Sequence, residues 1–540
     1  MSGFVGLGYP AALVDALRAR FDATASPRSL GLLVVAAVGD GKGGGLGRLA
    51  APGLLSRLIY AWAGASPEFT SLIAAGGLEA HNLPLGVVSH MIRDVGAGRP
   101  GPITRIGVGT FVDPVNGGGK RGPPAARAAA RDVVRRVTFP PAATPPGGAP
   151  RTFLHYTPPR SIDVALLRGT TADEDGNIAF GREALVLDAL SQAIAAHNSG
   201  GTVIVQVARV VPAGSIPPRA VIIPGVLVDR VVVVPGPQTL GFGQADPAPD
   251  AVAALCGSAS RGGGGGGGGG ASPPPPTPAA ASPLPTGVRR IVARRAMLAL
   301  GALCTPGSLV NIGVGMAEGV AACVASPLAT ADIPASLPLV LSTEAGAIGG
   351  APVGGRLFGA SSHAAAHVPT PTMLDLYNGG AVVCAVLGAA EVSAGGDVNV
   401  SSFPGRAPGC GGFIDISQSS RAVVFVGTFT SGGLAVAVER GGASGRQPML
   451  RIVREGRHRK FKAGVAEKTF AGEAGRGRPV LYVTERAVFR LVVVGGGVAA
   501  ELELIEVAPG IDVARDVLGQ MGFAPRLASP LGLMDGRCFE

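Results

Sequence analysis

One carboxylate, that of Glu344, stands in a setting that suits chemistry. It belongs to the run P-L-V-L-S-T-E-A-G-A-I-G-G at 338–350, where the apolar stretch 339–341 predicts a short buried strand leading into a glycine-rich turn. Glycines after the glutamate leave the backbone bare, so a large ligand can approach the carboxylate without meeting side chains. Such a carboxylate can act as a base, a metal ligand or a nucleophile. A solvated glutamate at a strand end is the plain structural alternative.

Two further segments of the second half place glycines where an expected strand meets a loop. They are V-N-I-G-V-G-M-A-E-G at 310–319 and A-P-G-C-G-G-F-I-D-I-S at 407–417. Backbone N–H groups on bare glycines can stabilise an oxyanion, which is the charge that develops when a carboxylate attacks a carbonyl.

Composition sets the class of protein. A chain of 540 residues predicts two large domains, and its 47% of hydrophobic residues include no apolar stretch long enough to span a bilayer. Six cysteines without metal-ligand spacing fit free thiols in a reducing compartment. The net charge of +10 permits a polyanionic ligand such as a nucleotide, but 4% of aromatic residues offers little for base stacking. We expect neither a membrane nor a nucleic-acid partner.

Strands and helices alternate in the first half. Apolar strands are expected at 31–38, 163–167, 202–207 and 230–234, and helices at 10–21 and 184–196. This alternation predicts an α/β fold with parallel pairing, in which ligands bind near the carboxyl ends of the strands.

A low-complexity tract separates the two halves. Nine successive glycines at 262–270 and four prolines at 273–276 cannot bury a core. The second half repeats the first in outline, because 312–321 resembles 5–14 and 383–398 resembles 163–178. The expected domains are an α/β domain over 1–240, a disordered tether over 241–287, and an α/β domain over 288–540 that carries Glu344.

Together, these segments resemble the class I CoA-transferases, the group that includes 3-oxoacid and acetate or propionate CoA-transferases. The match is closest to the propionate type. Other matching segments are G-F-V-G-L-G-Y-P at 3–10, N-L-P-L-G-V-V-S-H-M-I-R-D at 82–94, G-V-G-T-F-V-D-P at 107–114, V-F-V-G-T-F-T at 424–430 and L-Y-V-T-E-R-A-V-F-R-L at 481–491. The resemblance covers nearly all of the chain outside the tether.

The resemblance implies two similar open-sheet α/β domains with flanking helices and an active site at their interface. The implied enzyme moves CoA from a short-chain acyl-CoA to a free carboxylic acid by a ping-pong mechanism through a glutamyl-CoA thioester. It uses CoA as a substrate, with no other cofactor and no metal. A homodimer or homotetramer in the cytoplasm is expected, or in mitochondria if a true N-terminus is missing.

The resemblance also assigns residue roles. Glu344 becomes the nucleophile, and Gly411 and Gly412 become oxyanion donors. The acyl side of the substrate is assigned to a second set, which is otherwise an ordinary turn between a strand and a helix: Asn311, Gly313 and Gly315.

The chain departs from the family at three places. Leu85 stands where a glutamine amide faces the substrate, Ala317 replaces a common proline, and no strand precedes the opening segment. Asn82 or His90 could substitute for the lost amide. An acyl-CoA hydrolase, in which water intercepts the glutamyl thioester, is the alternative among enzymes. Leu85 and the missing strand suggest a second alternative, a catalytically weak CoA-binding paralogue. A nucleic-acid binder, suggested by charge alone, ranks far behind both.

Overall fold

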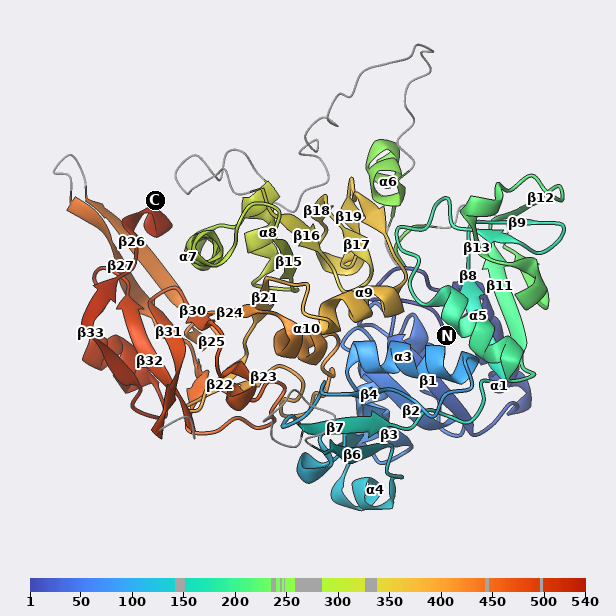
Figure 1. Ribbon diagram of the computed structural model, residues 1–540, viewed down its shortest axis with the longest axis horizontal. Coiled ribbons are helices and arrows are strands. Elements are labelled where there is room, and N and C mark those ends of the chain that lie inside the picture. The colour runs from blue at the N-terminus through green and yellow to red at the C-terminus, as the bar shows by residue number, and fades with distance from the viewer. Residues whose placement is uncertain are drawn as a thin grey trace, which may run out of the picture. The chain divides into compact units, whose positions relative to one another are not determined.

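The computed structural model describes the chain except for residues 141–150, 235–238, 243–244, 247, 258–283, 326–337, 442–445 and 496–498 (Figure 1). Most of the tether expected over 241–287, including 258–283, lies outside the described residues, but its part at Pro249–Cys256 forms a helix and is not disordered as expected. The chain forms two compact units. Unit 1 comprises Met1–Ala280, Thr343–Asp375 and Pro404–Asp415, and unit 2 comprises Ala281–Ser342, Leu376–Phe403 and Ile416–Glu540.

This division differs from the expected domain boundaries. Two segments of the second half, 343–375 and 404–415, belong to unit 1. The reason is hydrogen bonding between segments that are far apart in the sequence. The N–H of Ala63 donates to the carbonyl of Pro408, and the N–H of Thr370 donates to the carbonyl of Leu187. The turn that carries Glu344 is therefore part of unit 1.

Unit 1 is built from several short sheets, parallel, antiparallel and mixed, together with six helices that lie wholly within it. Its helices are α1 (Ala11–Thr24), α2 (Pro67–Ala74), α3 (Leu85–Gly96), α4 (Pro124–Ala129), α5 (Ala189–Asn198) and α6 (Pro249–Cys256). Its strands from the first half are β1 (Leu30–Ala36), β2 (Leu55–Trp62), β3 (Glu79–Asn82), β4 (Ile103–Thr104), β5 (Lys120–Arg121), β6 (Val134–Phe139), β7 (Arg151–Tyr156), β8 (Val164–Arg168), β9 (Thr171–Asp173), β10 (Ile178–Ala179), β11 (Thr202–Val207), β12 (Arg209–Val211), β13 (Val221–Ile223) and β14 (Arg230–Val233). The later segments add β17 (Ala347–Ile348), β18 (Ala351–Pro352), β19 (Ser361–Ser362) and β20 (Ala366–His367).

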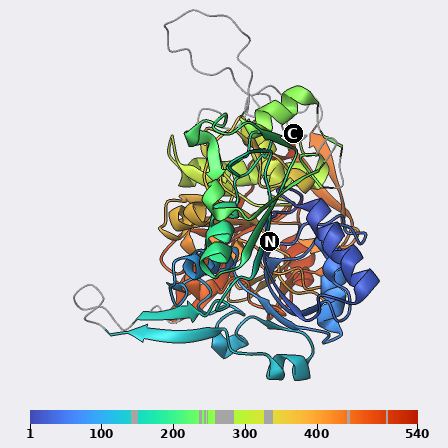
Figure 2. The ribbon, with the colours of Figure 1, turned by 90° about the vertical axis from the view of Figure 1, so that its right-hand side faces the viewer.

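Two parallel sheets dominate this unit. In one, β1, β2 and β3 run parallel and β5 closes the edge antiparallel. In the other, β11 lies between β8 and β14, and all three are parallel. Helix α3 packs on β1 and β2, α5 packs on β8 and β11, and the two helices touch each other (Figure 1). The β6–β7 hairpin, cyan in Figure 2, extends away from these sheets.

Unit 2 contains a long mixed sheet with strand order β16-β15-β21-β24-β30-β31-β32-β33. Its strands are β15 (Leu309–Ile312), β16 (Val340–Ser342), β21 (Cys384–Gly388), β22 (Glu391–Ser393), β23 (Val398–Asn399), β24 (Ala422–Val426), β25 (Thr430–Ser431), β26 (Ala435–Gly441), β27 (Arg446–Arg454), β28 (His458–Arg459), β29 (Phe461–Lys462), β30 (Val480–Val483), β31 (Ala487–Val494), β32 (Ala499–Val507) and β33 (Arg526–Leu533). Its helices are α7 (Gly287–Leu303) and α8 (Glu318–Ala325), while α9 (Thr370–Asn378) and α10 (Phe413–Ser419) each begin in unit 1 and end in unit 2.

Of the two repeats expected from the sequence, the one between 163–178 and 383–398 is present in the strands, whereas 5–9 forms only isolated bridges and no strand that would match β15. In unit 1, β8 is followed by the antiparallel pair β9 and β10, with Ala172 opposite Ile178. In unit 2, β21 is followed by the antiparallel pair β22 and β23, with Val392 opposite Val398. The next strand of each unit, β11 or β24, pairs parallel with β8 or β21. The prediction of two similar open-sheet α/β folds is confirmed.

Candidate active site

Glu344 lies in a tight turn directly after β16. The N–H of Gly346 donates to the carbonyl of Thr343 at 3.1 Å, which closes a β-turn with Glu344 at its second position. The N–H of Thr343 donates to the carbonyl of Ala347 at 3.0 Å, so the chain pairs with itself on both sides of the turn. Glu344 is only 8% exposed.

Two threonine hydroxyls connect this turn to neighbouring segments. Thr343 Oγ1 donates to the carbonyl of Gly359 at 2.6 Å, and Thr370 Oγ1 donates to the carbonyl of Ala345 at 3.2 Å. Both threonines are buried, so these bonds are shielded from competing water. The backbone on either side of Glu344 is therefore fixed. Thr370 carries no motif that the sequence could have singled out.

Gly346 is required for the shape of the turn. Its φ is +115°, and a methyl group at this position would lie 2.0 Å from the carbonyl oxygen of Val368. The same two residues are hydrogen bonded, because the N–H of Val368 donates to the carbonyl of Gly346 at 2.9 Å. Only glycine allows both the backbone conformation and this close approach.

The glycine-rich segment near 410 runs alongside the end of β2. The N–H of Ala63 donates to the carbonyl of Pro408 at 2.7 Å, and the N–H of Gly411 donates to the carbonyl of Ala61 at 2.9 Å. A segment of the second half thus continues the hydrogen bonding of a strand from the first half.

Asn82, at the end of β3, anchors the same segment. Its side-chain amide donates to the carbonyls of Ala61 at 2.7 Å and Tyr60 at 3.0 Å. Its Oδ1 accepts from the N–H of Cys410 at 3.1 Å and from the guanidinium of Arg121 at 3.3 Å. With these bonds made, Asn82 is committed to structure and does not replace the amide lost at Leu85. Sequence reasoning missed this anchoring role, which depends on contacts across 328 positions of the chain.

Leu85 begins helix α3 and lies against the glycine-rich segment. Its N–H donates to the carbonyl of Gly411 at 2.9 Å, and its side chain is 1% exposed. The next residue, Gly86, donates its N–H to Asp415 at 3.1 Å. A methyl group at Gly86 would lie 2.4 Å from the Asp415 carboxylate and 3.0 Å from Leu374.

The start of α9 ties the Glu344 turn to α3. Thr370, the first residue of α9, binds the turn, and Leu374 lies against Gly86. Further along α3, Nε2 of His90 lies 3.1 Å from the Asp375 carboxylate. Hydrogen bonding from His90 lowers the pKa of Asp375. Nε2 of His90 is thus held by α9, through the Asp375 carboxylate and the carbonyl of Pro371.

The expected oxyanion donors differ in their hydrogen bonding. The N–H of Gly411 already donates to Ala61, so in this structure it is not available to an oxyanion. The N–H of Gly412 makes no hydrogen bond within the described part of the chain. The expectation that Gly411 donates to an oxyanion stays a prediction, and it requires this N–H to exchange the carbonyl of Ala61 for the oxyanion.

The other expected substrate residues lie in unit 2. The amide of Asn311 donates to the carbonyl of Ser342 at 3.3 Å and to the hydroxyl of Tyr377 at 3.0 Å. The N–H of Gly313 donates to Val386, and the N–H of Gly315 donates to Glu318 at 3.0 Å. These contacts are those of a strand leading into a helix.

Two further properties of the described residues bear on chemistry. They include no cluster of three or more His, Cys, Asp or Glu side chains that could hold a metal ion. No helix among them is both long and apolar enough to cross a membrane. Their six cysteines are free thiols, and Cys410 is buried beside Gly411.

Comparison with known proteins identifies the family. Residues 1–234 match the family model described as Coenzyme A transferase. The chain is 36% identical to caffeate CoA-transferase of Acetobacterium woodii, over 99% of this chain and 92% of the relative. It is 35% identical to acetate CoA-transferase YdiF of Escherichia coli K12, over 98% of this chain and 89% of the relative.

The fold agrees with a solved structure of the same group. The acyl-CoA transferase YdiF of E. coli O157:H7, in a thioester complex with CoA, superposes with a TM-score of 0.83 at 33% identity. The similarity covers 100% of this chain and 92% of that one. The chain therefore belongs to the coenzyme A transferase family and is an enzyme that transfers CoA.

Proposed function

We propose that this enzyme moves CoA from a short-chain acyl-CoA to a free carboxylic acid through a covalent thioester on Glu344. The observation that carries the proposal is the position of Glu344, a nearly buried carboxylate in a turn whose backbone is fixed on both sides. A fixed carboxylate next to bare backbone is suited to attack a bulky thioester. Relatives named for caffeate and acetate support a carboxylic acid as the acceptor.

The reaction consists of two exchanges. A Glu344 oxygen attacks the thioester carbonyl and the carbon–sulfur bond breaks. The products of this step are an acyl-glutamyl anhydride and free CoA thiolate. The thiolate then attacks the glutamyl carbonyl, the carbon–oxygen bond breaks, and the donor acid departs to leave glutamyl-CoA. The acceptor carboxylate repeats both steps in reverse. Each intermediate remains an activated carboxylate, so the free energy of the thioester is kept.

Each attack places negative charge on a carbonyl oxygen. Gly412 is our candidate for the hydrogen-bond donor that stabilises this oxyanion, because its N–H donates to no other described residue. Gly411 would contribute its own N–H only after releasing Ala61. One preorganised donor of this kind is worth about 10²-fold in rate. Asn311, Gly313 and Gly315 remain candidates for the acyl side.

Transfer and hydrolysis differ in which molecule attacks glutamyl-CoA, the acceptor acid or water. A direct test follows acetyl-CoA with propionate by two readouts, formation of propionyl-CoA and release of free thiol. We expect propionyl-CoA with little free thiol. Release of thiol as the main product would instead establish a hydrolase.

The matched variant for this test is Glu344→Gln. Glutamine keeps the size of the side chain but cannot accept and pass on CoA. We expect no transfer and unchanged thermal stability. Full transfer by Glu344→Gln would refute the role of Glu344.

A further inference from the structure

Two of the six cysteines meet in the core of unit 2. Cys304 directly follows the last residue of α7, and Cys384 is the first residue of β21. The thiol of Cys384 donates a hydrogen bond to the sulfur of Cys304. The carbonyl of Ala385 is a second acceptor for the same thiol, at 3.9 Å. The two sulfur atoms are therefore in direct contact.

The order of the elements brings these two thiols together. The turn at 305–308 leads from Cys304 into β15, and β15 runs parallel to β21 with Val310 opposite Cys384. Helix α7 packs against β21, and both cysteines belong to the same buried core. The contact between the thiols is thus set by a short turn, a strand pair and a packed helix, and it is a property of the fold.

The two thiols differ in how easily they are reached. Cys384 is completely buried, whereas Cys304 is 7% exposed and is followed by the exposed residues Thr305, Pro306 and Gly307. The hydrogen bond from Cys384 lowers the pKa of Cys304, and the same bond, together with burial, raises the pKa of Cys384. Because the thiolate is the reactive form of cysteine, a small solute that enters from the turn reacts first at Cys304.

Two other cysteines of the same core provide an internal comparison. Cys323 and Cys538 are also buried, but neither is hydrogen bonded to a second cysteine among the described residues. Burial raises the pKa of Cys323, and it raises the pKa of Cys538 to about 12. Buried thiols of this kind are inert.

We propose that Cys304 and Cys384 are an oxidation site, at which a hydroperoxide such as hydrogen peroxide converts the two thiols into a reversible disulfide. Since the sulfur atoms already touch, the bond forms by rotation of the side chains and needs no rearrangement of distant segments. In a reducing compartment such a disulfide is transient, because other thiols reduce it again. This inference does not depend on the catalytic role of Glu344.

The oxidation takes place in two steps. The Cys304 thiolate attacks one oxygen of hydrogen peroxide, the oxygen–oxygen bond breaks, and a sulfenic acid and hydroxide form. Cys384 then loses its proton and attacks the sulfenic sulfur, the sulfur–oxygen bond breaks, and a second hydroxide leaves. With the two thiol protons the products are one disulfide and two molecules of water. The nearby Cys384 also prevents further oxidation of Cys304 to the irreversible sulfinic acid.

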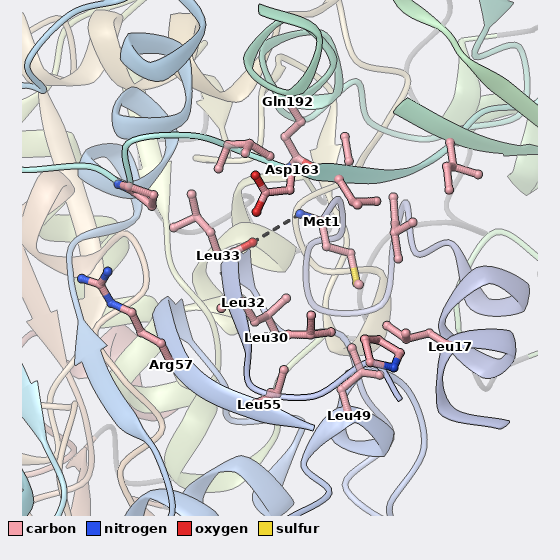
Figure 3. Close-up of a pocket in the computed structure, with 18 of the residues that line it drawn as sticks. Met1, Leu17, Leu30, Leu32, Leu33, Leu49, Leu55, Arg57, Asp163 and Gln192 are labelled. Atoms are coloured by element: carbon pink, nitrogen blue, oxygen red, sulfur yellow. Dashed lines mark hydrogen bonds between the residues drawn. The ribbon is translucent and has the colours of Figure 1, made fainter. Parts of the chain in front are cut away.

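The test treats the full-length enzyme with hydrogen peroxide, removes the peroxide, unfolds the chain in acid and labels the remaining thiols with iodoacetamide. We expect the number of labelled thiols to fall from six to four, and a reducing dithiol to restore six. Peptide mass mapping should find the Cys304 and Cys384 peptides joined. Peroxide also oxidises thioethers such as that of Met1, which lies in an apolar cavity of about 630 Å³ in unit 1 (Figure 3). Methionine sulfoxide adds an oxygen without joining peptides, so the joined pair is specific to the thiols.

Two variants separate this pair from the other core cysteines. Cys304→Ser should retain all five of its thiols under the conditions that convert the parent, whereas the control Cys323→Ser should fall from five to three. The loss in the parent should be at least about tenfold faster than any loss at Cys323 or Cys538, because their pKa values are raised. Six labelled thiols in the treated parent, a joined pair that omits Cys384, or a pair that links two chains would overturn the proposal.

Discussion

The backbone N–H of Leu85 donates to the carbonyl of Gly411 across 2.9 Å and joins the start of α3 to the glycine-rich segment of the second half. This bond uses only main-chain atoms, so it is kept whatever side chain stands at position 85. The side chain itself is buried, at 1% exposure. Position 85 therefore offers a substitution that changes the chemistry of the side chain while the main-chain contact remains.

Leu85→Gln is expected to raise kcat/KM. Glutamine has nearly the volume of leucine and can donate a hydrogen bond to the reacting carbonyl, an effect on the order of 10²-fold. The affinity for CoA should change little. Rates with propionyl-CoA and acetate provide the measurement, and Leu85→Met is the apolar control, expected to match the parent. An unchanged or lower rate in Leu85→Gln would mean that this side chain does not face the substrate.

Asn82→Ala is expected to lower both stability and activity. The change removes the hydrogen bonds that the Asn82 side chain makes to Cys410, Ala61 and Tyr60, at a net cost of about 0.5–1.5 kcal/mol for each. The control is Asn116→Ala, because Asn116 also donates to two backbone carbonyls but is exposed. Thermal unfolding and kcat of the two variants test this. Equal Tm values would contradict the anchoring role of Asn82.

Gly346→Ala is expected to disrupt the Glu344 turn. The new methyl group would lie 2.0 Å from the Val368 carbonyl, at a φ of +115°. Gly355→Ala is the matched control, because Gly355 also has a positive φ, +65°, but no atom lies within 4 Å of an added methyl group. The control should lose about 1 kcal/mol from backbone strain alone, and Gly346→Ala should lose clearly more, together with most of kcat. A Tm for Gly346→Ala equal to that of the control would show that the turn tolerates a side chain.

Stability should decrease at mildly acidic pH. His367 lies in β20 opposite Ala347, and burial lowers the pKa of its imidazole. Burial likewise lowers the pKa of His81. The unfolded chain, with imidazole pKa values near about 6.5, then binds more protons than the folded chain below that pH. The stabilising contribution is thus complete above about pH 6.5 and is lost as the pH falls toward the folded pKa.

Unfolding measured between pH 7.5 and 5 checks this expectation. His367→Phe should weaken the dependence on pH, because it removes one of the groups whose pKa is lowered by burial. His197→Phe, at an exposed position, should leave it as in the parent. Stability that rises on acidification, or an unchanged slope in His367→Phe, would contradict the assignment.

Much of the fold was predictable because strands buried on both faces read as continuous apolar runs. The strand expected at 202–207 is β11 at Thr202–Val207, and the one expected at 31–38 is β1 at Leu30–Ala36. The helix expected from 184 begins only at Ala189, after Leu187 takes a φ of +56° that breaks the helical path. Local periodicity cannot anticipate such a turn.

The site was predictable only in part. The turn that carries Glu344 was predictable because adjacent glycines encode it, whereas the role of Glu344 stays a prediction. The oxyanion expectation for Gly411 did not anticipate Ala61, since a hydrogen bond between distant segments leaves no local pattern. The assignment of 343–375 and 404–415 to unit 1 has the same origin.

The covalent intermediate on Glu344 is the central claim, and peptide mass mapping tests it most directly. The enzyme is incubated with acetyl-CoA and no acceptor acid and is then digested under mildly acidic conditions. The masses of the peptides are measured by mass spectrometry. We predict that the peptide containing Glu344 gains the mass of CoA less one water, and that propionate added before digestion removes this mass. A CoA adduct on a different residue would contradict the account. So would an enzyme that catalyses CoA transfer while its Glu344 peptide is never modified.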